Sequence, residues 1–228
     1  MIEDILAIVH IFSCRLYGLR KYKKQMSSDV ELQCRMLQVE RHIIDRQHNF
    51  FKTLDDLAFK SKNLYNKANY YMRQNFFEKG GKLNDRLNIK ELYALTKPTE
   101  SYAALPQKVS AGVIKQVIHD WKAWFQAMKQ WFVVPEEFEK KPQIPRYKHK
   151  ELGRNLLIYD NQSIGQKGKK KGNGIIKLAC STVKLFTDIK EVKEVRVVPA
   201  TASYVIEVVY EKEIVPARLN PLLIAGID

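Results

Sequence analysis

The chain has 228 residues, of which 45% are hydrophobic and 11% aromatic, so it can bury a substantial core as one large or two small domains. Its 39 lysines and arginines against 25 acids give a net charge of +14, which indicates polyanionic partners, nucleic acid or an anionic membrane surface. Three cysteines, odd in number and without CxxC spacing, indicate neither a disulfide framework nor a zinc ribbon and favour a reducing compartment. No apolar run reaches the roughly 18 residues that span a bilayer.

Residues 1–35 combine a short apolar stretch with a basic segment, "CRLYGLRKYKKQMSSD". Two interpretations are open for them: a leader outside the fold, or a helix over residues 2–16 that docks on the helical part of the chain, because its apolar residues keep helical spacing. Residues 36–47 follow with β-branched residues in alternating character, which predicts one strand.

Residues 48–132 are mostly helical in period. Apolar residues from Phe50 to Tyr71 recur at helical spacing and predict a long first helix. "EKGGKLN" breaks this helix, "IKELYALT" predicts a short second helix, and "KPTESYAALP" predicts a loop. A third helix starts near Pro106, and valines, tryptophans and Met128 fall on one face of it within roughly 120°.

Four lysines lie opposite that apolar face, each seven residues after the last. Because seven helical residues drift by only about 20°, they form a single stripe. The lysine stripe consists of Lys108, Lys115, Lys122 and Lys129. It contains no acids, and it is interpreted either as an ordinary solvated face or as a surface for nucleic acid.

From residue 133 the pattern changes to short β-rich runs separated by turn residues. A basic segment broken by prolines, residues 134–154, joins the helices to these runs and is called the connector below. The runs predict a compact antiparallel β domain over residues 133–218, and "QKGKKKGNG" predicts a lysine-tipped hairpin loop within it. The expected fold class is therefore α+β, with a helical part and a compact antiparallel β domain that can form a small barrel.

Clustered cations and aromatic side chains are the features that suit nucleic acid, because cations contact phosphates and aromatic rings stack on bases. In the connector the cations are Lys140, Lys141, Arg146, Lys148, Lys150 and Arg154. In the hairpin loop they are Lys167, Lys169, Lys170 and Lys171. Tyr147 and Tyr159 are the aromatic candidates for stacking.

Several motifs in order resemble a known family: "YAALPQKVSAGVIKQVIHDWKAWFQAMKQW", "KKPQIPRYK", "VRVVPATASYVIEVVYE" and "AGID". They are similar to the TnpB (OrfB) proteins of insertion-sequence transposons, over about residues 36–228. "LYNKANYYMRQ" resembles an early helix of that family, with Tyr65, Asn66 and Arg73 at its positions. The resemblance implies an RNA-guided DNA endonuclease that acts in transposition. In this family a helical recognition lobe is inserted into a wedge-like antiparallel β barrel, and a RuvC nuclease domain follows.

On this resemblance, residues 219–228 are the first strand of the RuvC domain, and Asp228 matches its first catalytic carboxylate and Mg²⁺ ligand. Cleavage with two Mg²⁺ ions needs several converging carboxylates. We therefore expect this chain to cleave nothing by itself. The implied partners are transposon-derived guide RNA and target DNA in the bacterial cytoplasm, at the nucleoid, with no membrane and no small-molecule substrate. Asn66 and Arg73 join the nucleic-acid-binding candidates.

The resemblance begins at Met36, which implies an initiator there and a leader of translated upstream sequence over residues 1–35. Three alternatives remain open. The chain is a DNA-binding accessory protein of a transposon or an inactive relic, or it is a structural RNA-binding protein of ribosomal type. The "GID" strand alone is also similar to the opening of actin-like ATPases, although no nucleotide loop follows it here.

Overall fold

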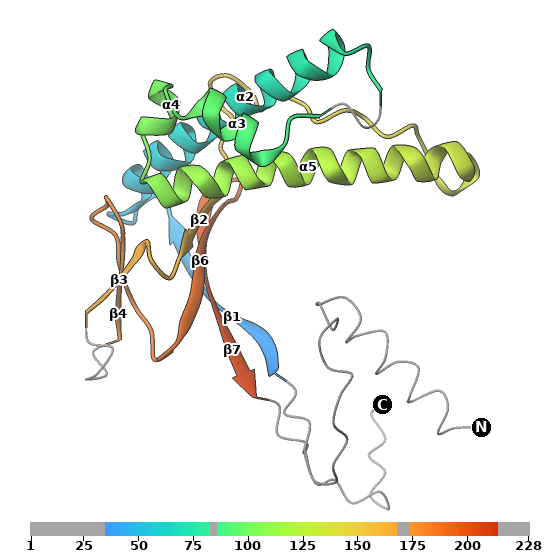
Figure 1. Ribbon diagram of the computed structural model, residues 1–228. Helices are drawn as coiled ribbons and strands as arrows, with labels where there is room; N and C mark the ends of the chain where they lie inside the picture. The colour runs from blue at the N-terminus through green and yellow to red at the C-terminus, as the bar shows by residue number, and fades with distance from the viewer. Residues whose placement is uncertain (1–34, 83–85, 168–173, 214–228) are drawn as a thin grey trace, which may run out of the picture. The chain divides into compact units, whose positions relative to one another are not determined.

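The computed structural model describes residues 35–82, 86–167 and 174–213, which fold as α+β. Helices α2 to α5 lie in the chain between strand β1 and six later strands (Figure 1). In chain order the elements are β1 (Arg35–Asp45), α2 (Phe51–Glu78), α3 (Ile89–Thr96), α4 (Glu100–Ala103), α5 (Gln107–Val133), the 3₁₀ turn η1 (Pro135–Glu137), β2 (Leu157–Asp160), β3 (Ile164–Lys167), β4 (Ile175–Leu178), β5 (Lys184–Phe186), β6 (Val192–Pro199) and β7 (Ser203–Glu213).

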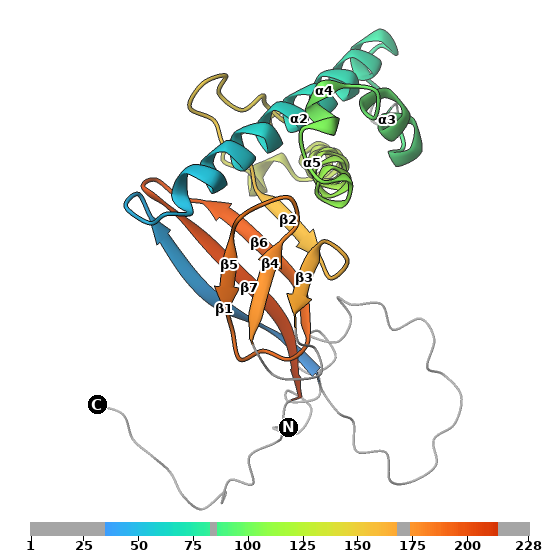
Figure 2. The ribbon, with the colours of Figure 1, turned by 90° about the vertical axis from the view of Figure 1, so that its left-hand side faces the viewer.

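The described strands form two antiparallel sheets and no closed barrel. One sheet has the order β1-β7-β6-β2, and the other has the order β3-β4-β5. The two views in Figures 1 and 2 show the smaller sheet lying against one face of the larger. Strand β1 pairs with β7 along its whole length, from Arg35 opposite Glu213 to Asp45 opposite Ser203. The helical lobe is therefore an insertion between two neighbouring strands.

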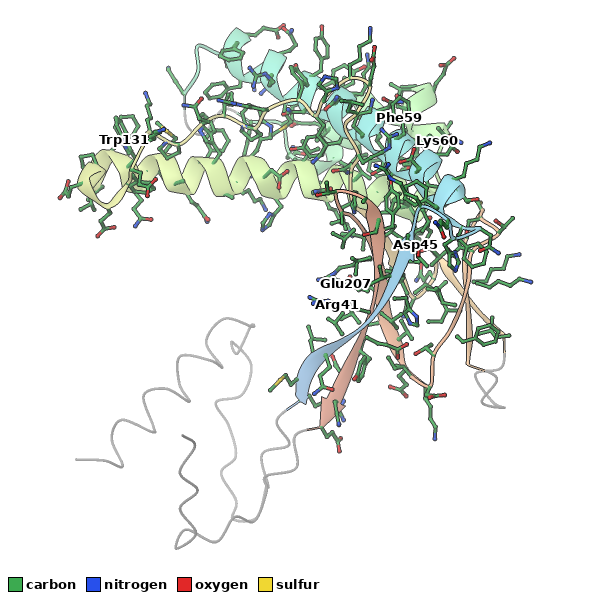
Figure 3. All side chains as sticks on the ribbon, turned by 180° about the vertical axis from the view of Figure 1, so that it is seen from behind. Arg41, Asp45, Phe59, Lys60, Trp131 and Glu207 are labelled. Atoms are coloured by element: carbon green, nitrogen blue, oxygen red, sulfur yellow. The ribbon has the colours of Figure 1, made fainter. Side chains whose placement is uncertain are left out.

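Alternation of side chains builds the core between the two sheets. Tyr204, Ile206 and Val208 of β7 are buried, as a period of two residues requires for one face of a strand. Ile176 and Leu178 of β4 are buried in the same apolar cluster, which continues into the helices. The opposite face of the β1–β7 pair is solvated and bears ion pairs, such as Arg41 Nε 3.3 Å from Glu207 Oε1 (Figure 3).

The two long helices pack on one another through aromatic side chains. Phe76 of α2 makes edge-to-face contacts with Trp121 and Trp124 of α5, at ring-centroid distances of 5.6 and 5.4 Å. Such pairs stabilise a core beyond the area they bury. The apolar arc predicted for α5 is confirmed for Val109, Val113, Val117, Trp121 and Met128, which are buried. Its other two members, Trp124 and Trp131, are only half-buried. Phe132, in the last turn, is 62% exposed, so the wider apolar face is not covered to its end.

Helix α3 matches the predicted segment, and a capping box explains its start. The Asn88 side chain accepts from the backbone N–H groups of Lys90 and Glu91, and Glu91 accepts from the backbone N–H of Asn88 at 2.7 Å. The segment predicted as a loop after α3 contains the short helix α4. Thr99 caps this helix by accepting from the backbone N–H of Tyr102. The helix has only four residues, too few for helical spacing to show in the sequence.

The β region follows the prediction with local differences. Strands β6 and β7 match the predicted runs, and β3 pairs with β4 on either side of the lysine-tipped loop, as a hairpin requires. The runs at 155–164 and 175–187 each divide into two strands at a turn. Strand β1 begins at Arg35, one residue before the expected domain start. Residues 1–34 of the leader and the final strand at 219–228 lie outside the described residues.

Candidate nucleic-acid interface

The lysine stripe is solvent-exposed at all four positions, as the helical spacing predicted. Lys108, Lys115, Lys122 and Lys129 project from α5 on the side away from its buried arc. Within the described ranges no ion pair joins any of the four to an acid. Burial raises the pKa of the Asp160 carboxyl, but hydrogen bonds from Ser163 outweigh it and hold this pKa below its usual value, with a smaller contribution from the charge of Lys108. The stripe therefore presents a row of positive charge to solvent.

The connector is fixed along α2 by a row of polar side chains, which we call the polar ladder: Lys62, Asn66, Asn69 and Arg73. These residues are spaced by four, three and four, so they lie on one face of the helix. Each donates a hydrogen bond to a connector carbonyl. Lys62 donates to Lys150, Asn66 to Lys148, and Asn69 and Arg73 both to Pro145.

Asn66 makes the most complete contact of the ladder. Its Nδ2 donates to the Lys148 carbonyl at 2.8 Å, while its Oδ1 accepts from the Lys148 backbone N–H at 2.8 Å. One side chain thus replaces the two partners that a neighbouring strand would offer. Asn66 and Arg73 were expected to contact nucleic acid, and the structure places both against the connector backbone instead of leaving them free.

Asn69 extends the ladder into the core between the two long helices. It is fully buried, and its Oδ1 accepts from the indole N–H of Trp121 at 2.8 Å while its Nδ2 donates to Pro145 O at 3.1 Å. Trp124 of α5 donates to the carbonyl of Pro142 at 3.2 Å. The connector is therefore held by both long helices.

The end of the connector is anchored by an ion pair. Both carboxylate oxygens of Asp55 accept from Arg154, at 2.7 Å each, and Tyr204 Oη of β7 also donates to Asp55 at 2.7 Å. The Arg154 hydrogen bonds hold the pKa of Asp55 below its usual value, although burial opposes them. Arg154 was expected to contact nucleic acid. Its charge is instead balanced by Asp55, and its side chain is only 24% exposed.

The other connector cations divide into outward and inward groups. Lys140, Arg146 and Lys150 are exposed. The Lys141 ammonium lies 5.2 Å from the ring centre of Trp131 and remains exposed. Lys148 is half-buried over the ring of Tyr65, at 4.8 Å, and this burial lowers its pKa. The exposed members are the ones that phosphates can reach.

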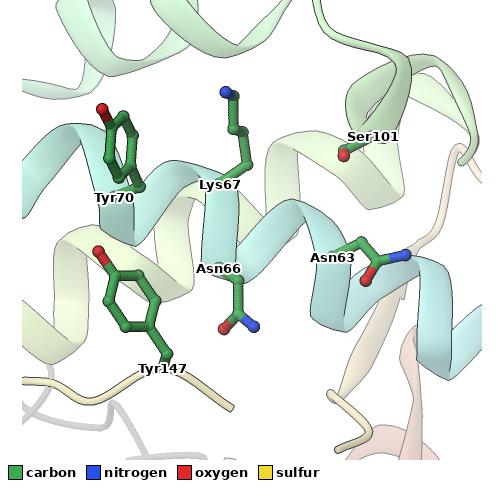
Figure 4. A pocket seen from close by; sticks show the side chains of 6 residues that line it. All are labelled: Asn63, Asn66, Lys67, Tyr70, Ser101 and Tyr147. Carbon is green, nitrogen blue, oxygen red and sulfur yellow. The ribbon is translucent and has the colours of Figure 1, made fainter. Parts of the chain in front are cut away.

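An open hollow of about 430 Å³ lies beside the polar ladder (Figure 4). It is lined by side chains from α2, α4 and the connector: Asn63, Asn66, Lys67, Tyr70, Ser101 and Tyr147. Tyr147 was expected to be an exposed aromatic residue and is 47% exposed. Tyr159 was expected to be available for stacking, and this was wrong: it is fully buried in β2 because it shares the inward face of the strand with Leu157.

Sequence reasoning missed the hollow and most of the polar ladder. The lining of the hollow comes from three separate elements, α2, α4 and the connector, and no spacing in the sequence joins them. The ladder had one signal, a row of polar residues at helical spacing within an amphipathic helix. Such a row normally marks a solvated face, but Lys62 and Asn69 are buried.

The remaining candidates lie where the structure gives no side-chain position. Lys167 ends β3, whereas Lys169, Lys170, Lys171 and Asp228 are outside the described residues. Across the described ranges, no three His, Cys, Asp or Glu side chains gather closely enough to hold a metal ion. Nor does any described helix have the length and apolar character needed to cross a membrane.

The chain matches no protein-family model, and no curated protein is significantly similar to it.

Proposed function

We propose that this chain binds nucleic acid and forms the guide-RNA- and target-DNA-binding part of an RNA-guided nuclease that resembles TnpB. The observation that supports this most directly is the lysine stripe, a row of four exposed lysines on a 27-residue helix. Proteins that follow a phosphate backbone need such rows, because each neutralised phosphate releases condensed counterions and adds affinity.

The connector supports the same proposal. It is fixed without regular secondary structure along most of its length, and it still presents Lys140, Arg146 and Lys150 to solvent. A rigid backbone with outward cations suits the fixed geometry of a nucleic-acid strand. In this proposal the connector and the β domain bind RNA, whereas the helical lobe contacts the DNA or the RNA–DNA heteroduplex through its backbone geometry.

The proposal extends to segments outside the described residues. In this proposal, segments outside the described residues complete the β domain as a wedge-like barrel. Residues 219–228 begin a RuvC domain, and Asp228 is one of its Mg²⁺ ligands. The described residues offer no carboxylate cluster for Mg²⁺, so no catalytic step is assigned to them.

Binding to RNA at several salt concentrations tests the proposal. The logarithm of the association constant should fall with the logarithm of salt by about 0.7 for each phosphate neutralised on a single strand. Replacing the lysine stripe with glutamines should reduce the corresponding slope for an RNA–DNA heteroduplex, which the helical lobe contacts in this proposal, by up to about 3 to 4. A matched control replaces four exposed lysines elsewhere, Lys79, Lys90, Lys97 and Lys190, and removes the same net charge.

The proposal fails if the protein binds no RNA at low salt, or if its binding does not depend on salt. An equal loss of slope in the control variant would show that charge in general, not the stripe, drives binding. Transposon-end RNA compared with random RNA of equal length separates a guide-binding protein from the alternatives. An accessory DNA-binding protein, an inactive relic or a ribosomal-type RNA-binding protein should not prefer the transposon-end RNA.

A further inference from the structure

The hollow beside the polar ladder exposes two aromatic rings on one surface. Tyr70 of α2 is 43% exposed and Tyr147 of the connector is 47% exposed, and both line the same open space (Figure 4). Both rings are thus partly in contact with water. No acidic residue lines the hollow, and its one charged lining residue is Lys67.

Tyr147 is held in place before any ligand arrives. The residues on either side of Arg146 and Tyr147 are fixed to α2, because Pro145 accepts from Asn69 and Arg73, and Lys148 exchanges two hydrogen bonds with Asn66. The Arg73 guanidinium also lies 5.2 Å from the centre of the Tyr147 ring. A rigid ring loses little conformational entropy when a ligand binds, which raises affinity.

Tyr70 is positioned by its own helix. Its ring makes an edge-to-face contact with Tyr71 at 5.7 Å, and the Lys67 ammonium lies 5.5 Å from its centre. The ammonium thus sits beside an aromatic face, with no carboxylate partner within ion-pair distance in the described part of the chain. A phosphate would supply the missing negative charge.

We propose that this hollow binds one unpaired nucleotide of a nucleic-acid strand, with its base stacked against the tyrosine rings and its phosphate beside Lys67. The inference rests on the proposed nucleic-acid-binding function and adds a site to it. The volume of about 430 Å³ lies within the range of small-ligand sites. The amide of Asn63 and the hydroxyl of Ser101 can donate to and accept from the edge of a base. A base within a duplex has both faces covered by its neighbours, so the hollow selects single strands.

The test uses the full chain and three probes of equal length: single-stranded oligouridine, single-stranded oligothymidine and a blunt duplex. Tyr70→Ala and Tyr147→Ala should each weaken single-strand binding about 5- to 100-fold, since one base stacked on an aromatic ring contributes about that factor. The salt dependence should stay unchanged in both variants, because no phosphate contact is lost. Lys67→Gln should instead reduce the salt slope by about 0.7.

Controls separate stacking from damage to the fold. Tyr70→Phe and Tyr147→Phe keep the ring and should bind within about twofold of the unchanged protein. Phe132→Ala removes an exposed ring outside the hollow and should also leave binding unchanged. If Tyr147→Ala lowers the melting temperature, Tyr70→Ala still tests the proposal, because Tyr70 makes none of the hydrogen bonds that hold the connector on α2. Quenching of a single 2-aminopurine in the strand reports stacking directly and should disappear in both alanine variants.

The outcomes distinguish the two proposals. If the unchanged protein binds none of the probes, the proposed function itself fails. If it binds them with salt dependence and the two alanine variants bind single strands equally well, the hollow is not a nucleotide site, although the proposed function stands. Equal losses for oligouridine and oligothymidine assign the hollow to any unpaired strand, and a loss with oligouridine alone assigns it to RNA. A loss equally large with the duplex would overturn the assignment.

Discussion

Replacing Asn69 with alanine should destabilise the protein more than any exposed substitution on α2. The alanine removes the acceptor of the Trp121 indole N–H, and the Trp121 side chain is fully buried. A buried donor left without a partner costs about 1–3 kcal/mol, and the lost hydrogen bond to Pro145 contributes about 0.5–1.5 kcal/mol more. The expected loss in the free energy of unfolding is therefore about 2–4 kcal/mol.

Thermal and urea unfolding of the full chain measure this loss. For a protein of this size, each kcal/mol lowers the melting temperature by roughly 2–4 °C, so Asn69→Ala should lower it by roughly 5–15 °C. Asn63→Ala is the matched control, with the same residue type on the same helix at a half-exposed position outside the ladder. It should change the free energy of unfolding by less than about 0.5 kcal/mol.

Limited digestion with trypsin shows whether the connector is the part released. Cleavage after Arg146, Lys148 or Lys150 requires the connector to leave α2, so it should be slow in the unchanged protein and faster in Asn69→Ala. If Asn69→Ala unfolds within about 0.5 kcal/mol of the unchanged protein and resists trypsin equally, the ladder does not hold the connector, and the reasoning is refuted.

Two further predictions concern the pH dependence of stability, and a third concerns DNA cleavage. Arg154 lowers the pKa of Asp55, so the stability from this pair is present above about pH 4 and is lost as pH falls through the lowered pKa. In Asp55→Asn the free energy of unfolding, measured with urea, should therefore fall less steeply with decreasing pH. An unchanged dependence on pH would contradict the prediction. Burial and then the charge of Arg154 lower the pKa of Lys62, so stability should rise as pH increases towards about 10.4, and Lys62→Met should lack this rise between pH 7 and 9.5. With Mg²⁺, guide RNA and target DNA the chain should leave the DNA intact; cutting that Asp228→Ala abolishes would show that the site is complete after all.

The sequence predicted those elements whose own residues specify them. Helix α3 has a capping box within four residues, and β6 and β7 have a period of two bounded by turn residues. The arc and the lysine stripe of α5 followed from helical spacing alone. In each case the signal and the structure it specifies lie in the same short segment.

The candidate site could be predicted only in part, because its contacts join distant segments. The ladder hydrogen bonds connect side chains of α2 to backbone carbonyls 72 to 88 residues away, and backbone carbonyls have no sequence signature. A separation of 99 residues likewise hid the pairing of Arg154 with Asp55. Tyr159 was misplaced because two adjacent apolar residues, Ile158 and Tyr159, left the inward face of β2 ambiguous.

The pairing of β1 with β7 has a consequence for the order of events during synthesis. Asp45 and Ser203 are opposite one another, and about 160 residues must leave the ribosome between them. At about 5–20 residues per second, β1 waits on the order of ten seconds for its partner. Helices α2 to α5 are local structures and can associate during this delay, whereas the larger sheet closes only after β7 emerges. The contacts between β1 and β7 therefore join residues far apart in the sequence, whereas those within the helical lobe join closer residues, and we expect the lobe to fold first.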